Sequence, residues 1–448
     1  MNSAVTVNPC KLCAPLGASM AYRGIDGCMP LLHGSQGCST YIRRYMISHF
    51  KEPVDIASSN FTEDTAIFGG ADNLARALDS IIEQYNPQMI GVASTCLSET
   101  IGDDVNMFLD DYKRKKNLQG IKLPYISYVS TASYCGTHMD GFYSAVVSVL
   151  KEITVNADKG PQCVLFPHMA SCADLRIFKE MLACFYEDFV VLPDYSDTLE
   201  GGLWDKYYRI PGGGTSVADI ASIGGAGLAL ELGLSRAGRD SAAGFVRERF
   251  GVDSVTVHPP VGVLLSDEFV RILAQRSGKD IAPQLKRDRQ VLLDSYADAH
   301  KYVYGKKVLL YGEEDLVISL AYFLCETGME PVVCGTGAAG GTMKRCLEEL
   351  GRKYAIDIDI YQSSDFDDLA EAAAMRNVDL ILGNSKGLVI SRRLDVPLVR
   401  VGFPVHDRIG AARIACAGYK GTLQLFDRIV NTLLEEKQRK EPLGFTYM

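Results

Sequence analysis

From about residue 87 onward, short apolar runs bounded by Gly or Pro alternate with stretches in which apolar residues recur every three to four positions. The short runs predict buried parallel strands, and the longer period predicts helices packed on them. This alternation is clearest in the last third of the chain, and it is typical of a doubly wound Rossmann-like domain. There we predict strands at 307–311, 331–334, 356–361, 379–382 and 398–401, and helices at 316–326, 343–354 and 367–376.

The same pattern extends over most of the 448 residues, a length that corresponds to about three domains at roughly 150 residues each. The middle segment opens near Pro161, where QCVLF predicts a strand, and contains a Gly-rich stretch at 201–227. A charged helix is expected from Ser277 to about Tyr304, linking the middle and last domains. We therefore predict an α/β fold of three Rossmann-like, doubly wound parallel-sheet domains, with boundaries at 1–158, 159–304 and 305–448.

The composition is that of a packed globular protein, with 47% hydrophobic and 23% charged residues. Its 46 Lys and Arg against 55 Asp and Glu give a net charge of −9, so no global positive field attracts phosphate backbones or anionic lipid. No stretch approaches the roughly 20 apolar residues that cross a bilayer. We expect no nucleic-acid partner, no membrane association and a cytoplasmic location.

Residues 335–340 match the dinucleotide fingerprint G-x-G-x-x-G, and Asp357 and Asp359 follow about 20 residues later. The motif, however, follows the second predicted strand of its domain rather than the first, and a tight turn between strand and helix needs glycine in any case. Gly341 stands where a P-loop requires Lys. We expect no nucleotide on this chain and assign any ATP chemistry to a partner; a nucleotide-sugar- or dinucleotide-binding protein is the alternative from another class.

Thirteen cysteines are spread over the chain, and a reducing compartment disfavours disulfides. Cys10 and Cys13 form a C-x-x-C that lacks a second such pair for zinc and follows Asn8-Pro9 rather than a strand. Cys13, Cys38 and Cys96 each lie in a turn rich in small residues, where backbone can approach an inorganic sulfide closely. Three thiols are an incomplete set for a cubane, so the pattern indicates a cluster completed by another subunit; ordinary buried thiols are the alternative.

Residues 8–110 resemble the β-type subunits of the nitrogenase family, in the strings NPCKLCAPLGA, GIDGCMPLLHGSQGC, HFKEPVDIASSNFTEDTAIFGG and VASTCLSETIGDD. The intervals from Cys13 to Cys38 (38 − 13 = 25) and to Cys96 (96 − 13 = 83) equal those of the three P-cluster cysteines in the β subunit of molybdenum nitrogenase. The resemblance continues to the end of the chain through RVGFPVHDRIGAARIACAGYKGTLQLFDRIVNTLLEEKQ and is weakest in the middle third. It implies the nitrogenase component 1 fold.

The resemblance implies roles for individual residues. Cys13, Cys38 and Cys96 correspond to ligands of an iron-sulfur cluster shared with an α-type subunit. Ser133 matches the serine that can ligate oxidised P-cluster iron. Tyr41 matches a residue on the electron path between the P-cluster and the cofactor.

Phe68 matches an aromatic residue at the docking surface for the ATP-hydrolysing iron protein. For Phe68, Tyr41 and Ser133, plain packing or surface exposure is the alternative. Asp103 and Asp104 are expected to cap a helix or face solvent, because no acid-base role follows from the motif. Cys10 and Cys28 have no place in the P-cluster pattern.

The function implied by the resemblance is that of the β-type subunit in an α2β2 heterotetramer with a NifD- or NifE-like α-type partner. It would hold a [8Fe-7S] P-cluster or a [4Fe-4S] cluster at the αβ interface and relay electrons from a NifH-like ATPase iron protein. The leading version is a NifEN-like scaffold for nitrogenase cofactor maturation, because the short segment before Cys13 and the ending PLGFTYM resemble NifN. The alternative is a catalytic nitrogenase-like reductase, such as a methylthio-alkane reductase or a nitrogenase, active only as a complex.

Overall fold

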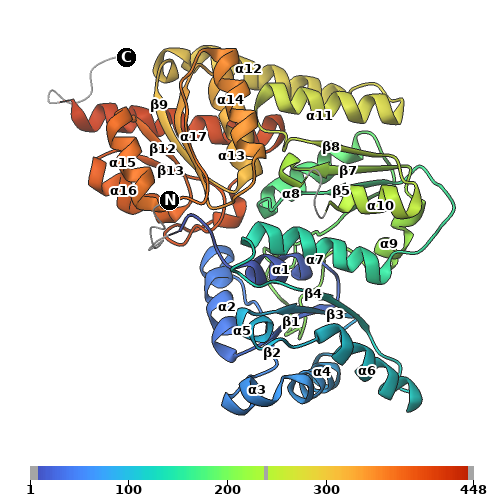
Figure 1. The fold of residues 1–448 in the computed structure, drawn as a ribbon. Coiled ribbons are helices and arrows are strands. Elements are labelled where there is room, and N and C mark those ends of the chain that lie inside the picture. The colour runs from blue at the N-terminus through green and yellow to red at the C-terminus, as the bar shows by residue number, and fades with distance from the viewer. Residues whose placement is uncertain (1–8, 237–240, 442–448) are drawn as a thin grey trace.

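The computed structural model describes residues 9–236 and 241–441 and contains three parallel β-sheets flanked by helices (Figure 1). All paired strands within the three sheets run parallel. The predicted fold class is therefore confirmed. Each sheet lies inside one of the three predicted segments, whose boundaries remain a prediction. The PLGFTYM ending, residues 442–448, lies outside the described residues.

The first sheet has the strand order β2-β1-β3-β4. Its strands are β1 (Cys28–His33), β2 (Ala57–Ser58), β3 (Met89–Ser94) and β4 (Tyr125–Val129). Its helices are α1 (Ala14–Arg23), α2 (Gln36–Phe50), α3 (Glu63–Phe68), α4 (Ala71–Tyr85), α5 (Cys96–Ile101), α6 (Val105–Leu118) and α7 (His138–Ile153). Every residue of β1 and β3 is buried, as expected for parallel strands that are covered on both faces.

The second sheet has the order β6-β5-β7-β8 and confirms the strand predicted in QCVLF. Its strands are β5 (Cys163–Phe166), β6 (Phe189–Val191), β7 (Leu228–Leu232) and β8 (Ser254–Val257). Its helices are α8 (Cys172–Ala183), α9 (Val217–Ser222), α10 (Ala242–Phe250), α11 (Gly262–Ser277) and α12 (Pro283–Val303).

The charged helix predicted from Ser277 to about Tyr304 is confirmed as α12 (Pro283–Val303), except that Ser277 itself ends the preceding helix α11, so two helices meet there. The first, α11, ends at Ser277, where Gly278 adopts a left-handed conformation with φ of 69° and caps the helix. The second, α12, begins at Pro283, since proline is preorganised for the first helical position.

The third sheet has the order β11-β10-β9-β12-β13, the 3-2-1-4-5 arrangement of a Rossmann-like domain. Its strands are β9 (Lys307–Gly312), β10 (Glu330–Thr336), β11 (Asp359–Tyr361), β12 (Leu380–Gly383) and β13 (Leu398–Arg400). Its helices are α13 (Glu314–Glu326), α14 (Thr342–Tyr354), α15 (Phe366–Arg376), α16 (Leu388–Leu394) and α17 (Gly418–Lys440). All five predicted strands and three predicted helices are confirmed in order, whereas the short helix α16 and the long helix α17 were not predicted.

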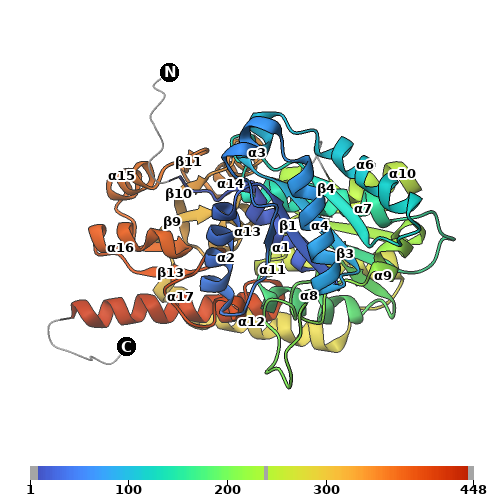
Figure 2. The same cartoon turned by 90° about the horizontal axis from the view of Figure 1, so that it is seen from below.

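The third domain is tied to the second mainly through its last helix. Helix α17 lies along α12 and also contacts α8 (Figure 2). At its start, the buried Asp174 carboxylate accepts hydrogen bonds from the backbone N–H groups of Cys416 and Ala417, both at 2.8 Å. Among residues 9–236 and 241–441, we find no helix with the length and apolar character needed to span a bilayer.

Helices α1 and α7 cross with their backbones in direct contact beside the first sheet (Figure 1). A Cβ atom on Gly17 would lie 1.7 Å from the carbonyl oxygen of His138, and one on Gly141 would lie 1.9 Å from the carbonyl oxygen of Ala14. Neither position has room for a side chain. This contact holds the start of α1 against the start of α7.

We expect the substitution Gly141→Ala to lower the free energy of unfolding by about 3 kcal/mol, because the added methyl group must force the two helices apart. The same exchange in an unobstructed helix normally stabilises by about 1 kcal/mol. Chemical denaturation of both proteins measures the difference. Gly160→Ala is the matched control, since no atom lies within 4 Å of its added Cβ; equal losses in the two variants would contradict the prediction.

Candidate functional site

The three cysteines predicted as ligands each lie at the start of a helix. Cys13 is the N-cap residue of α1, Cys38 is in the first turn of α2, and Cys96 is the first residue of α5. Helices α2 and α5 follow β1 and β3, which pair in parallel with His33 opposite Ser94. Because the carboxyl ends of neighbouring parallel strands share one edge of the sheet, Cys38 and Cys96 meet there despite their separation in sequence.

Cys13 and Ser133 reach the same edge by other routes. The backbone N–H of Ser133, which follows the next strand β4, donates a hydrogen bond to the Cys96 sulfur at 3.3 Å. Cys13 is carried there by the crossing of α1 and α7. The pKa of the Cys13 thiol is raised to about 11, chiefly by burial and to a smaller extent by the neighbouring thiols of Cys38 and Cys96, so the three sulfurs are electrostatic neighbours.

The edge that carries the three thiols is open on one side. Within the described residues, no three His, Cys, Asp or Glu side chains surround one point closely enough to hold one ion. The sulfurs lie at an open edge, since Cys96 is exposed and Cys13 and Cys38 are half-buried. Iron would favour the thiolate forms that burial and mutual repulsion oppose. The open side leaves space for ligands from a second chain.

Tyr41 and Phe68 both lie on the surface near this edge. Tyr41 lies one turn beyond Cys38 on α2, is 54% exposed, and forms a hydrogen bond between its hydroxyl and that of Tyr45 at 2.9 Å. Burial, with the Tyr41 hydroxyl next in importance, raises the pKa of Tyr45 to about 12, so Tyr45 stays protonated at neutral pH. Phe68 ends α3 and is 85% exposed. Neither aromatic ring is part of the core.

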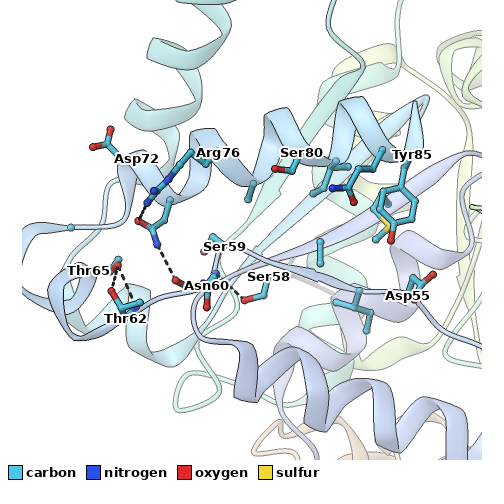
Figure 3. A pocket seen from close by; sticks show the side chains of 18 of the residues that line it. Asp55, Ser58, Ser59, Asn60, Thr62, Thr65, Asp72, Arg76, Ser80 and Tyr85 are labelled. Atoms are coloured by element: carbon cyan, nitrogen blue, oxygen red, sulfur yellow. Dashed lines mark hydrogen bonds between the residues drawn. The ribbon is translucent and has the colours of Figure 1, made fainter.

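Phe68 also borders a polar groove of about 780 Å³ between the edge strand β2 and helix α4 (Figure 3). Ser58 and Asn60 line the strand side, and Asp72 and Arg76 line the helix side. Among the described residues that line the groove there is no cysteine. The groove is therefore separate from the thiol site, which is formed by Cys13, Cys38 and Cys96.

One pair near the site was not anticipated. The buried ring of His33 bonds Asp103 at 3.0 Å from its Nε2, and the Asp103 carboxylate also accepts the backbone N–H of Gly70. The expectation that Asp103 caps a helix or faces solvent is wrong, because its side chain is almost fully buried. Asp104 does cap α6, by accepting the N–H of Met107. A polar residue at the end of a buried strand, as His33 is in β1, was the signal available in the sequence.

Another segment of this chain fills the space beside the glycine motif at residues 335–340. A Cβ on Gly337 would lie 2.3 Å from the carbonyl oxygen of Cys10. The Cys10 N–H donates to the Ser364 oxygen at 3.0 Å, and Lys386 Nζ donates to the Pro9 oxygen at 3.3 Å. The glycines thus admit the segment 9–12, at the position where a pyrophosphate would have to approach. The dinucleotide alternative loses its structural basis.

Cys10 and Cys28 differ from the three predicted ligands in their surroundings. Both are buried, and burial raises the pKa of each to about 12. Cys10 lies under the glycine motif, and Cys28 begins β1. Both behave as small apolar groups.

Residues 13–434 match the family described as nitrogenase component 1 type oxidoreductase. The chain belongs to the nitrogenase component 1 family. Within this family it is 34% identical to the nitrogenase molybdenum-iron protein beta chain of Clostridium pasteurianum over 439 residues, which are 98% of this chain and 95% of that protein. It is also 34% identical to the beta chain of Methanothermobacter thermautotrophicus over 445 residues, covering 96% and 95% of the two chains.

Among solved structures, a chain of nitrogenase Cp1 at pH 6.5 superimposes with a TM-score of 0.96 at 32% identity, covering 100% of this chain and 98% of that one. These relatives confirm the resemblance to β-type subunits and the component 1 fold. The narrower assignment to NifN remains a prediction.

The raised pKa of Cys13 predicts its reactivity in the metal-free nitrogenase-family chain. Because the thiolate is the reactive form, the rate of alkylation by iodoacetamide should keep rising through pH 10, by about tenfold per pH unit. Mass spectrometry of the modified peptide measures the rate, with exposed Cys96 as an internal reference for reagent access. A rate that levels off near the ordinary thiol value of 9.0 would contradict the prediction.

Proposed function

We propose that this chain is the β-type subunit of an α2β2 complex, in which Cys13, Cys38 and Cys96, with Ser133 beside them, hold an iron-sulfur cluster at the interface with an α-type subunit. The cluster relays electrons that an ATP-hydrolysing iron protein delivers. The observation that carries the proposal is the meeting of the three sulfurs and the Ser133 amide at one open edge of the first sheet.

The side chains around the thiols support an α-type partner. Tyr41, Leu97 and Tyr134 are exposed on segments next to the predicted ligands, although large apolar groups are normally covered. A second subunit over this edge would bury these side chains and supply the missing ligands. It would also exclude water, which is one of the factors that set a cluster's potential.

Backbone N–H groups of this chain donate hydrogen bonds that stabilise negative charge on the cysteine sulfurs. When bound, the cluster supplies one-electron chemistry at low potential. The amide of Ser133 donates to the Cys96 sulfur, and the amide of Leu16 lowers the pKa of Cys13 against the opposing effect of burial. Hydrogen bonds of this kind stabilise negative charge on sulfur. Tyr41 lies on the face assigned to the α-type partner, and exposed Phe68 provides the docking surface for the iron protein.

Two versions of this function differ in what the partner does with the electrons. In the scaffold version the complex matures a cofactor precursor, and a four-iron interface cluster suffices. In the reductase version it reduces a substrate through an eight-iron P-cluster. The contact between the Ser133 amide and Cys96 brings a candidate extra ligand to the site, and the similarity to molybdenum-iron beta chains points the same way. Both observations favour the reductase.

The complex co-expressed with its α-type partner should be brown and contain iron and acid-labile sulfide. Cys38→Ala should abolish the electron paramagnetic resonance signal of the interface cluster, because one of the three proposed thiolate ligands is lost. Cys28→Ala is the matched control, since that thiol is buried in β1, away from the thiol site. Unchanged iron content and spectrum in the Cys38 variant would count against the proposal.

Ser133→Ala distinguishes the two versions. If the cluster has eight irons, removing the hydroxyl should alter the signal of the oxidised state and leave the reduced state nearly unchanged, because Ser133 matches the serine that can ligate the oxidised P-cluster. If the cluster has four irons, neither state should respond. Iron quantification and redox titration with spectroscopy separate these outcomes, and an eight-iron cluster indifferent to the substitution would refute the role of Ser133.

A further inference from the structure

The residue immediately before Cys13 is held by His138 through two reciprocal hydrogen bonds. The Leu12 N–H donates to Nδ1 of the His138 ring at 3.2 Å. The His138 N–H donates to the carbonyl oxygen of Leu12 at 3.0 Å. That carbonyl belongs to the peptide group joining Leu12 to Cys13, so the second bond orients the peptide plane from which Cys13 projects.

The tautomer of His138 follows from these contacts. Because Nδ1 accepts, the neutral ring carries its proton on Nε2, which lies 3.4 Å from Oε1 of Glu313 at the start of α13. Glu313 is buried, with a side chain only 4% exposed. His138 therefore connects the backbone before Cys13, in the first domain, to a fixed carboxylate in the third.

Besides the contact with His138, other contacts also restrict the position of Cys13. Gly17 and Gly141 hold α1 on α7, of which His138 is the first residue. On the other side of Leu12, the Cys10 N–H is bonded to Ser364 in the third domain. Residues 10 to 17 are thus held at both ends. Between these ends, the Nδ1 atom of His138 accepts the hydrogen bond that the Leu12 N–H donates.

We propose that His138 is a positioning residue for Cys13, through which it sets the geometry of the interface cluster. The inference rests on the proposed function, since it takes Cys13 to be a ligand. His138 acts on the cluster only through Leu12. Loss of the Nδ1 acceptor would leave a partly buried N–H unpaired and free the peptide to rotate, which would displace the sulfur.

Two amide variants separate the two ring nitrogens. His138→Asn keeps an acceptor near the position of Nδ1, whereas His138→Gln keeps a donor near the position of Nε2. His138→Ala removes both. The ring borders a cavity of about 530 Å³, so the replacement side chains can be accommodated without overpacking.

In the co-expressed complex, His138→Ala and His138→Gln should each lose cluster iron to a chelator about tenfold more readily than the wild type, as expected when a ligand loses its support. They should also show a shifted cluster spectrum. His138→Asn should restore both properties to the wild-type values. A merely structural role would not discriminate between Asn and Gln in this way.

His168→Ala is the control for loss of a buried histidine. His168 is as buried as His138, lies in the second domain, and has no partner for its Nδ1 in the described residues. It should not change chelation or spectrum. If the wild-type complex contains no iron-sulfur cluster, the proposed function fails. If the wild type contains it and Asn and Gln variants behave alike, or His168→Ala loses iron equally, the positioning role of His138 is overturned.

Discussion

The backbone contact between α1 and α7 is the constraint on which the site depends. Cys38 and Cys96 would share an edge in any parallel sheet with this strand order, because both follow neighbouring strands. Cys13 precedes a helix that follows no strand of the sheet, and it reaches the edge only because Gly17 and Gly141 let two helices touch without intervening side chains. The close packing of α1 on α7 thereby decides whether the Cys13 sulfur lies beside those of Cys38 and Cys96.

In this chain alone, the surroundings of Cys13 oppose its thiolate form. Burial and the proximity of Cys38 and Cys96 both raise the pKa of Cys13, which opposes the thiolate form that iron requires. The amide of Leu16, at the start of α1, offsets part of this cost by lowering the pKa of Cys13. Positively charged iron would remove the remaining imbalance, because it stabilises the thiolate forms directly.

The third domain shows how a ligand-binding fold can be used for assembly. Its strand order and glycine-rich turn are those of a nucleotide-binding domain, but the turn packs on the chain's own residues 9–12. This segment leads directly to Cys13, and His138 connects the same segment to Glu313. The carboxyl end of the third sheet therefore serves as a support for the thiol site in the first.

The sequence by itself determined the fold class, the series of strands and helices in the last domain, and the three thiols with their intervals, because periodicity and turn chemistry are local. It did not determine the start of α12, which lies at Pro283 and not at Ser277, or the burial of Asp103, which is bonded to a histidine 70 residues away. The occupant of the glycine motif and the route of Cys13 to the sheet edge were likewise decided only by the tertiary structure. Each depends on contacts between segments far apart in the chain, and such contacts leave no periodic signal in the residues that make them.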